Sequence, residues 1–235
     1  MIKTREESST KTVHSAIFDM DGLLIDSEPL WYEAAVEVFE PLGIILTPEA
    51  YASSIGLRTK EFVANWFSRF NIDPSLAQIT EKNINDVVVR KIADKGDALP
   101  GVYDILKMFK ERGFSMGLAT SSPLRLVDVV VDKLKIREYF SAFASAENLV
   151  YGKPHPQVYL DCARELGTPP VNCICFEDSF HGVIAAKAAR MRCVAVPATA
   201  FIDQPRFHAA DLVLGSLEDF TLETLITALP HSQII

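Results

Sequence analysis

Residues 15–31 read SAIFDMDGLLIDSEPLW and contain the first segment that indicates the fold class. A short apolar run, residues 15–18, ends abruptly at Asp19 and is followed by a second acid, Asp21, and a glycine, Gly22. An apolar run that is closed by acids is typical of a buried strand with polar groups at its carboxyl end. Gly22 allows the chain to turn sharply after the second aspartate.

From residue 102 onward, short apolar runs alternate with segments of helical spacing. Strands are expected at residues 114–119, 142–145, 173–176, 193–196 and 212–214, and helices at 102–112, 124–134, 157–166 and 183–190. Strands that alternate with helices of this length predict an α/β fold, a Rossmann-like parallel sheet with helices on both faces.

One segment, residues 29–99, breaks the alternation. It contains no convincing strand and has amphipathic helical patterns at residues 31–39, 60–70 and 79–92. Because it leaves the chain directly after the acidic strand end, we interpret it as an inserted α-helical cap domain that covers a site there. The expected organisation is a flexible leader at 1–13, a sheet domain made of 14–28 and 100–235, and the cap at 29–99.

Composition restricts the possible partners. The 235 residues carry a formal net charge of −8, so no global field attracts nucleic acid or an anionic membrane. No apolar run is long enough to span a bilayer. The four cysteines lack metal-finger spacing and are expected to be buried and reduced, which favours a cytoplasmic protein. No sustained heptad pattern is present, so we expect a monomer.

Polar side chains gather where the predicted strands end. They are Asp19 and Asp21 after the first strand, Thr120 and Ser121 after the second, Lys153 after the third, and Glu177 and Asp178 after the fourth. In open α/β sheets, ligands bind outside the carboxyl ends of the strands. Four acids at one edge repel each other unless a cation lies among them, and oxygen ligands favour Mg²⁺. The sequence therefore predicts a magnesium site beside an anion pocket.

The spacing of Asp19 and Asp21 suggests a division of roles. In extended backbone, residues two apart point to the same side, so their carboxylates converge if the strand continues. One carboxylate can attack phosphorus while the other moves a proton. The pattern DxDG alone is a weak signal, and the matching strand ends later in the chain make it a candidate catalytic site.

Four segments carry a resemblance to a known family. FDMDGLLIDSEPLW (18–31), LATSSP (118–123), GKPHPQVYL (152–160) and FEDSFHGVIAA (176–186) resemble motifs I to IV of haloacid dehalogenase (HAD) phosphatases. They stand in the expected order, with the helical insert between the first two. IFDMDGLLIDSEPLW, SAENLVYGKPHPQVYLDCA and KAARMRCVAVPA are most similar to bacterial sugar-phosphate phosphatases of the hexitol phosphatase and 2-deoxyglucose-6-phosphate phosphatase type.

The resemblance implies a role for each motif residue. Asp19 would attack the phosphorus of a small phosphorylated metabolite to form an aspartyl phosphate, and Asp21 would transfer protons. The implied Mg²⁺ ligands are an Asp19 oxygen, the Asp21 carbonyl and the Asp178 carboxylate, with Glu177 acting behind them or through water. The implied substrate-binding groups are Thr120, the Ser121 backbone, Lys153 and, in the loop Gly56-Leu57-Arg58, Arg58.

Other classes of protein share part of this pattern. A phosphosugar mutase similar to β-phosphoglucomutase is the nearest enzymatic alternative. Trp31 lies where related mutases carry a histidine, which favours hydrolysis, although a core or hinge role for this tryptophan is the simpler interpretation. A dehalogenase shares the sheet and the nucleophilic aspartate but does not need a second aspartate two residues later, so Asp21 argues against this function. A receiver-type signalling domain or an inactive regulatory relative is the non-enzyme alternative, but receivers have no large insert after the first strand.

Overall fold

The computed structural model describes residues 14–228, and the predicted leader at 1–13 lies outside the described residues. Within residues 14–228, no helix is both long and apolar enough to cross a membrane.

A six-stranded parallel sheet forms the centre of the molecule, as predicted. Its order is β3-β2-β1-β4-β5-β6, so the acidic strand β1 is central. The strands are β1 (Ser15–Phe18), β2 (Ser115–Thr120), β3 (Ala142–Ser145), β4 (Cys173–Glu177), β5 (Arg192–Ala195) and β6 (Leu212–Val213). Phe18 is in register with Leu118 of β2 and Phe176 of β4, so the three strands end side by side.

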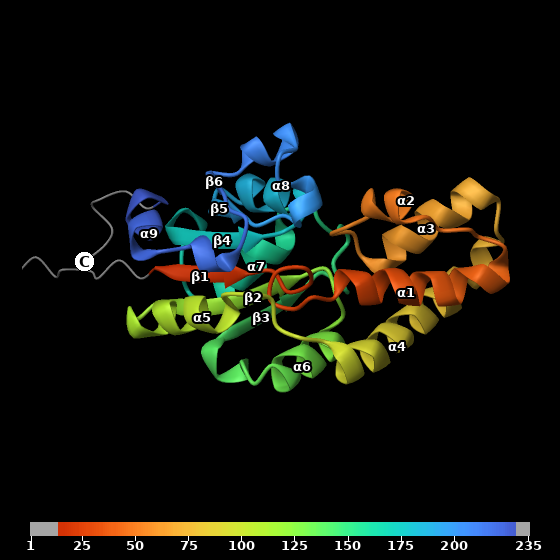
Figure 1. Cartoon of the computed structure of the whole chain (residues 1–235), viewed down its shortest axis with the longest axis horizontal. Coiled ribbons are helices and arrows are strands. Elements are labelled where there is room, and N and C mark those ends of the chain that lie inside the picture. Colours follow the sequence, from red (N-terminus) through yellow and green to blue (C-terminus); the bar gives the residue numbers. More distant parts are fainter. Residues whose placement is uncertain (1–13, 229–235) are drawn as a thin grey trace, which may run out of the picture.

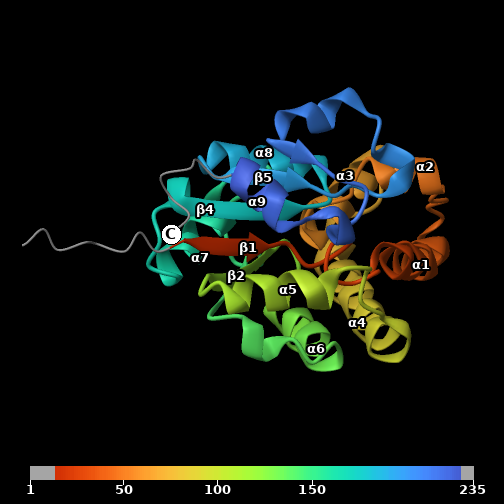
Figure 2. The same cartoon turned by 60° about the vertical axis from the view of Figure 1, so that its left-hand side comes forward.

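Helices cover both faces of the sheet (Figure 2). One face packs against α5 (Val102–Glu111) and α6 (Leu124–Lys133), and the other against α7 (Gln157–Glu165) and α8 (Phe180–Ala188). The chain continues to α9 (Leu222–Ala228). Short 3-10 helices lie in the connections, at Glu40–Leu42, Pro74–Leu76, Arg137–Tyr139, Pro170–Asn172, Thr199–Phe201, Pro205–Ala209 and Leu217–Asp219. Two buried clusters result, one on each side of the sheet.

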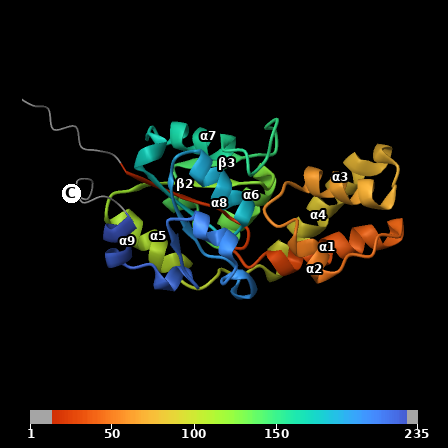
Figure 3. The ribbon, with the colours of Figure 1, turned by 90° about the horizontal axis from the view of Figure 1, so that it is seen from above.

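Four inserted helices lie beyond the carboxyl ends of the strands (Figures 1 and 3). They are α1 (Glu28–Phe39), α2 (Pro48–Ala52), α3 (Thr59–Phe70) and α4 (Ala77–Lys95), with no strand between them. An aromatic cluster holds them together, in which Phe39 stacks on Phe62 at 5.2 Å between ring centroids. We call these helices and their connections the cap, and the exact domain boundaries at 28/29 and 99/100 stay a prediction.

The structure differs from the sequence-based expectation at two places that matter for the site. Helix α8 begins at Phe180 instead of residue 183, because the Ser179 hydroxyl caps it by accepting a hydrogen bond from the Gly182 amide (3.0 Å). Helix α2 was not predicted, since five residues are too few to show a helical period. Its Thr47 side chain accepts from the Ala50 amide at 3.2 Å.

Aromatic rings pack around the end of β1. Phe18, the residue before Asp19, stacks on Phe176 at 4.8 Å and meets Phe109 edge-on at 5.9 Å. All three rings are fully buried. Closely packed rings of this kind restrict movement of the backbone, so the position of Asp19 is well defined. The four cysteines are free and buried, as expected.

Candidate active site

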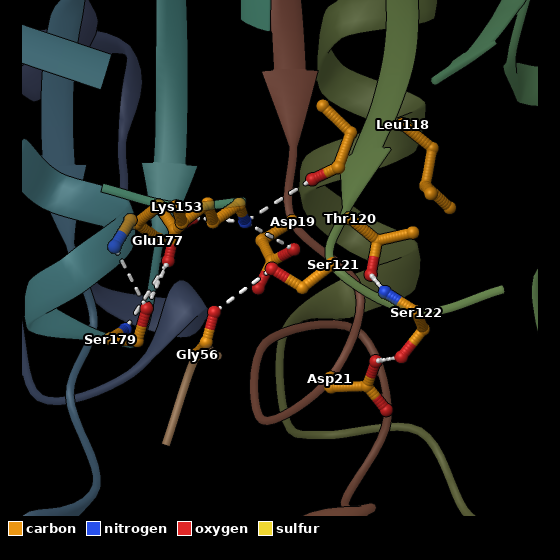
Figure 4. Close-up of polar contacts among 12 residues, drawn as sticks. Asp19, Asp21, Gly56, Leu118, Thr120, Ser121, Ser122, Lys153, Glu177 and Ser179 are labelled. Carbon is orange, nitrogen blue, oxygen red and sulfur yellow. Dashed lines mark hydrogen bonds and ion pairs between the residues drawn. The ribbon is translucent and has the colours of Figure 1, made fainter. Parts of the chain in front are cut away.

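Asp19 lies at the end of β1 and is 4% exposed. Its amide donates to the Phe176 carbonyl (3.0 Å), which extends the β1–β4 pairing by one residue. Its carboxylate accepts a hydrogen bond from the Lys153 ammonium at 2.8 Å (Figure 4). The sheet therefore delivers a buried carboxylate with one oxygen bound to a lysine.

Lys153 stands between two carboxylates (Figure 4). Its side chain is 1% exposed, and Nζ donates to Asp19 at 2.8 Å, to Glu177 at 2.5 Å and to the Ala119 carbonyl at 3.4 Å. Burial alone would lower the pKa of Lys153, but the charges of Asp19 and Glu177 outweigh it and raise the pKa above its usual value. Lys153 is a permanent buried cation.

Glu177 is fully buried, and protein donors occupy both of its oxygens. Oε1 accepts from Lys153 and from the Tyr159 hydroxyl, and Oε2 accepts from the Ser179 amide (3.2 Å) and hydroxyl (3.1 Å). A Cβ on Gly182 would lie 1.8 Å from Glu177 Oε1, so only glycine fits there. These contacts favour a supporting role for Glu177, in which it orients Lys153 and does not bind a metal ion directly.

Asp178 completes a cluster of acids that could hold a metal ion. One carboxylate oxygen each of Asp19, Glu177 and Asp178 lies within 4.8 Å of the others. Burial, together with the charge of Glu177, raises the pKa of Asp19 to about 8 and that of Asp178 well above its usual value. Three buried acids with a single ammonium are short of positive charge, and their oxygens are hard ligands, so the residues fit a divalent cation.

Gly22 brings the turn after β1 against this cluster. Its φ is +71°, and a Cβ would lie 2.3 Å from Asp178 Oδ2. The sharp turn expected from the sequence is present, and no side chain other than hydrogen fits between the turn and Asp178.

Asp21 lines the same cavity as Asp19 but lies beyond β1, which ends at Phe18, and forms an isolated β-bridge with Ile25. Oδ1 accepts from the Ser27 hydroxyl at 2.7 Å and from the Trp31 indole at 2.8 Å. Oδ2 accepts from the Ser122 hydroxyl at 2.7 Å (Figure 4). Both oxygens are thus held by neutral donors, two of them from the start of the cap.

Thr120 and Ser121, the predicted phosphate cradle, line the cavity at the end of β2. Thr120 Oγ1 accepts from the Ser122 amide at 3.0 Å, which shapes the turn. The Ser121 hydroxyl donates to the Gly56 carbonyl of the cap at 2.9 Å (Figure 4). The hydroxyl is therefore engaged with the cap, and the Ser121 backbone amide stays the predicted phosphate donor.

The cavity that these residues share is small and lies between the cap and the sheet. Its volume is about 50 Å³, room for on the order of four waters. Four acids line it: Asp19, Asp21, Glu28 and Asp178. Among the residues that the structure describes, no lysine or arginine lines this cavity.

Arg58, predicted to bind substrate, does not line the cavity, although Leu57 and Thr59 do. Its side chain is 5% exposed and forms an ion pair with Glu61 at 2.6 Å. The guanidinium also donates to three backbone carbonyls of the connection after β3. A direct contact between Arg58 and substrate would require these bonds to break.

Sequence reasoning missed several residues at the site. Trp31 lines the cavity and binds Asp21, instead of only packing in the core or hinge. Glu28 accepts from the Tyr51 hydroxyl at 2.9 Å, and burial next to Asp21 raises the pKa of Glu28 to about 7. Tyr159 donates to Glu177. Glu28 and Trp31 belong to the first motif and are close to Asp21 in the sequence, which could have identified them as site residues. No feature of the sequence indicated that Tyr51 or Tyr159 would lie at the site.

The fold and the site together define an α/β protein with a buried, lysine-paired aspartate beside an acidic metal-type cluster. A family model described as haloacid dehalogenase-like hydrolase matches residues 16–196. The chain therefore belongs to the haloacid dehalogenase-like hydrolase family, as the four motifs indicated.

Individual relatives cover nearly the whole chain. Hexitol phosphatase B of Escherichia coli (strain K12) is 43% identical over 224 residues, which are 93% of this chain and 99% of the relative. The crystal structure of CbbY from Rhodobacter sphaeroides in complex with phosphate has a TM-score of 0.82 at 28% identity, covering 91% and 99% of the two chains. A crystal structure of β-phosphoglucomutase from Clostridium difficile also has a TM-score of 0.82, at 25% identity and 92% and 96% coverage.

Proposed function

We propose that this protein is a magnesium-dependent phosphatase that hydrolyses phosphate monoesters of sugars or sugar alcohols. The observation that carries the proposal is the buried Asp19 carboxylate, bound by Lys153 at 2.8 Å and placed beside Asp178 and the Thr120 turn. The identity to a hexitol phosphatase over almost the full chain supports the substrate class.

In this proposal, Asp19 attacks phosphorus and becomes an aspartyl phosphate, which water then hydrolyses. The Lys153 ammonium holds one Asp19 oxygen, so the other oxygen is free to face the incoming phosphoryl group. The fixed positive charge also offsets negative charge that spreads over the phosphoryl oxygens in the transition state. Positioning and charge stabilisation of this kind supply most of the rate in phosphoryl transfer.

The metal would be held by the Asp19 and Asp178 carboxylates and, as the family resemblance implies, by the Asp21 backbone carbonyl. Once bound, Mg²⁺ would neutralise phosphoryl oxygens and orient them for in-line attack. Glu177 would act from behind, because Lys153, Tyr159 and Ser179 already bind its two oxygens.

Asp21 would protonate the leaving alcohol and later take a proton from water. For this, at least one of the hydrogen bonds that its carboxylate accepts from Ser27, Trp31 and Ser122 must first break. Because Ser27 and Trp31 flank the start of α1, a movement of the cap would change the position of Asp21 as well.

The charges around the cavity favour monoester hydrolysis over a mutase reaction. A mutase that passes through a bisphosphate must bind a second phosphoryl group, whereas the described lining contains four acids and no basic side chain. Like charges placed together cost several kcal/mol. The hydroxyl-bearing lining residues Tyr51, Ser54 and Thr59 suit a neutral polyol instead.

A panel of phosphorylated metabolites, assayed for phosphate release with Mg²⁺, tests the proposal. We expect hexose and hexitol monophosphates to exceed hexose bisphosphates in kcat/KM by about a hundredfold, equivalent to roughly 2.7 kcal/mol. Equal or better turnover of bisphosphates would contradict the charge argument. Interconversion of phosphate positions without release of phosphate would instead establish a mutase.

Magnesium should stabilise the fold more at pH 8 than at pH 6. The pKa of Asp19, about 8 in the folded chain, exceeds its ordinary value, so the metal-free folded state binds this proton more tightly than the unfolded state. Stability from that proton is therefore full at low pH and is lost as pH rises through about 8. Mg²⁺ replaces the proton. At a free Mg²⁺ concentration of a hundred times its Kd, binding adds about 2.7 kcal/mol to the free energy of unfolding.

Thermal unfolding in EDTA and in excess Mg²⁺ at both pH values measures this effect. We expect Mg²⁺ to raise Tm by about 5–10 °C at pH 8 and by less at pH 6. An Asp19→Asn variant, which has lost one ligand, serves as the control and should respond weakly. A Mg²⁺-independent Tm at pH 8 would remove the metal from the proposal.

A further inference from the structure

The Arg58 guanidinium is bound to the connection that follows β3. Nη1 donates to the carbonyls of Ala146 (3.0 Å) and Leu149 (2.6 Å). Nη2 donates to the Val150 carbonyl (3.3 Å) and to the Glu61 carboxylate (2.6 Å). A buried guanidinium is stable only where such acceptors surround it, so these bonds define the place of Arg58 in the cap.

This connection, residues 146–152, leads directly into Lys153. Glu61 Oε1 accepts a hydrogen bond from the Gly152 amide at 3.3 Å. A Cβ on Gly152 would lie 2.7 Å from Arg58 Nε and 2.8 Å from Glu61 Oε2. The ion pair of the cap therefore packs directly against the backbone that carries the active-site lysine.

The residues just before Arg58 contact the other two strand ends of the site. The Ile55 carbonyl accepts from His181 Nδ1 at 3.0 Å, and the Gly56 carbonyl accepts from the Ser121 hydroxyl at 2.9 Å (Figure 4). We call residues 55–58 the cap loop. It contacts the segments after β2, β3 and β4, which carry the phosphate cradle, Lys153 and Asp178 respectively.

The cap loop forms part of the wall of the cavity beside Asp19. The cavity of about 50 Å³ holds only a few waters, and a sugar phosphate is several times larger. A lift of the cap loop would make room for such a substrate beside Asp19, and that movement would separate Arg58 from residues 146–150.

We propose that Arg58, together with Glu61, is a positioning residue that couples the seating of the cap loop on the core to the placement of Lys153. The inference rests on the proposed function. When the loop is seated, Arg58 and Glu61 clamp residues 146–152, and Lys153 is held between Asp19 and Glu177. When the loop is lifted, the clamp is released and the lysine loses its backbone support. Full charge compensation at Asp19 then exists only in the closed, water-poor site.

An Arg58→Ala variant tests the coupling with two substrates, a hexitol monophosphate and p-nitrophenyl phosphate, which has no sugar hydroxyl. We expect kcat to fall for both by a similar factor, up to about a hundredfold, because small misplacements of a catalytic group have effects of that size. KM should change little, and the ratio of kcat/KM between the substrates should be unchanged. Lys60→Ala, an exposed cation at the start of the same helix, is the matched control and should retain wild-type kinetics.

A double-mutant cycle with Lys153→Ala separates coupling from general damage. If Arg58 acts through Lys153, then Arg58→Ala in the Lys153→Ala background should cost less than about threefold, because no lysine is left to position. Gly152→Ala, which pushes a methyl group against the clamp, should reproduce the kcat loss even if Arg58→Ala fails to fold.

Distinct outcomes would overturn the inference. A loss restricted to the hexitol phosphate, or a raised KM at constant kcat, would make Arg58 a substrate-binding residue. Equal losses in the wild-type and Lys153→Ala backgrounds would make it merely structural. If the wild-type protein released no phosphate from either substrate, the proposed function would fall first, and the inference with it. An active wild type with fully active Arg58→Ala and Gly152→Ala variants would refute the inference alone.

Discussion

Replacement of Asp19 by asparagine is expected to lower kcat for phosphate release by about four orders of magnitude or more, as loss of a nucleophile does in other enzymes. The change is isosteric and the amide oxygen can still accept from Lys153, so the geometry in Figure 4 is retained. Only the nucleophilic oxygen and its charge are lost. Steady-state phosphate release in Mg²⁺, with the best substrate of the panel, measures the effect.

The folded state of this variant should not be weaker than that of the wild type. Ionised Asp19 is destabilised by burial and by Glu177, so its removal relieves repulsion in metal-free buffer. We expect an equal or higher Tm in EDTA at pH 8, which separates chemistry from unfolding. Asp26→Asn, the same change at an exposed position, is the control. Retention of more than a tenth of wild-type activity by Asp19→Asn would exclude Asp19 as the nucleophile.

Much of the fold could be predicted because the sheet is buried on both faces. Parallel strands of this kind appear as continuous apolar runs, and all six were located to within a residue or two. Prediction was weakest where the bounds of a helix depend on local hydrogen bonds and not on the periodicity of apolar residues. Helix α2 has only five residues, and the start of α8 is set by one serine hydroxyl.

The candidate site was predictable to the extent that it comes from strand ends. Parallel strands end at the same edge, so Asp19, Thr120 and Asp178 were expected together, and all three line one cavity. Contacts that depend on how the cap sits on the core could not be predicted. Arg58 shows this, because its partners are backbone carbonyls some ninety residues away, and backbone carbonyls leave no trace in a sequence.

Lys153→Met is expected to lower activity strongly, to a residual but measurable rate, and also to destabilise the fold. The lysine is 1% exposed and is the only cation among the described contacts of Asp19 and Glu177. Removing one partner of a buried ion pair costs about 3–5 kcal/mol, because the remaining charges are left without compensation. Methionine fills a similar volume, so little of the loss should come from a cavity. Urea unfolding in EDTA, monitored at pH 8, measures the free energy.

The pH dependence of that loss identifies its cause. The Lys153 charge lowers the pKa of Asp19, so in the variant this pKa must rise further above 8. A carboxyl with a raised folded-state pKa stabilises the fold when protonated and loses that contribution as pH rises through the folded value. The deficit of Lys153→Met relative to wild type should therefore be smaller at pH 6 than at pH 9.5, because only the wild-type Asp19 ionises as the pH rises past about 8. Lys187→Met, which breaks a partly exposed pair with Asp211, should cost less than about 1 kcal/mol. A deficit of equal size at both pH values would mean that Lys153 stabilises the site by packing, and its proposed role as the cation that compensates Asp19 would be wrong.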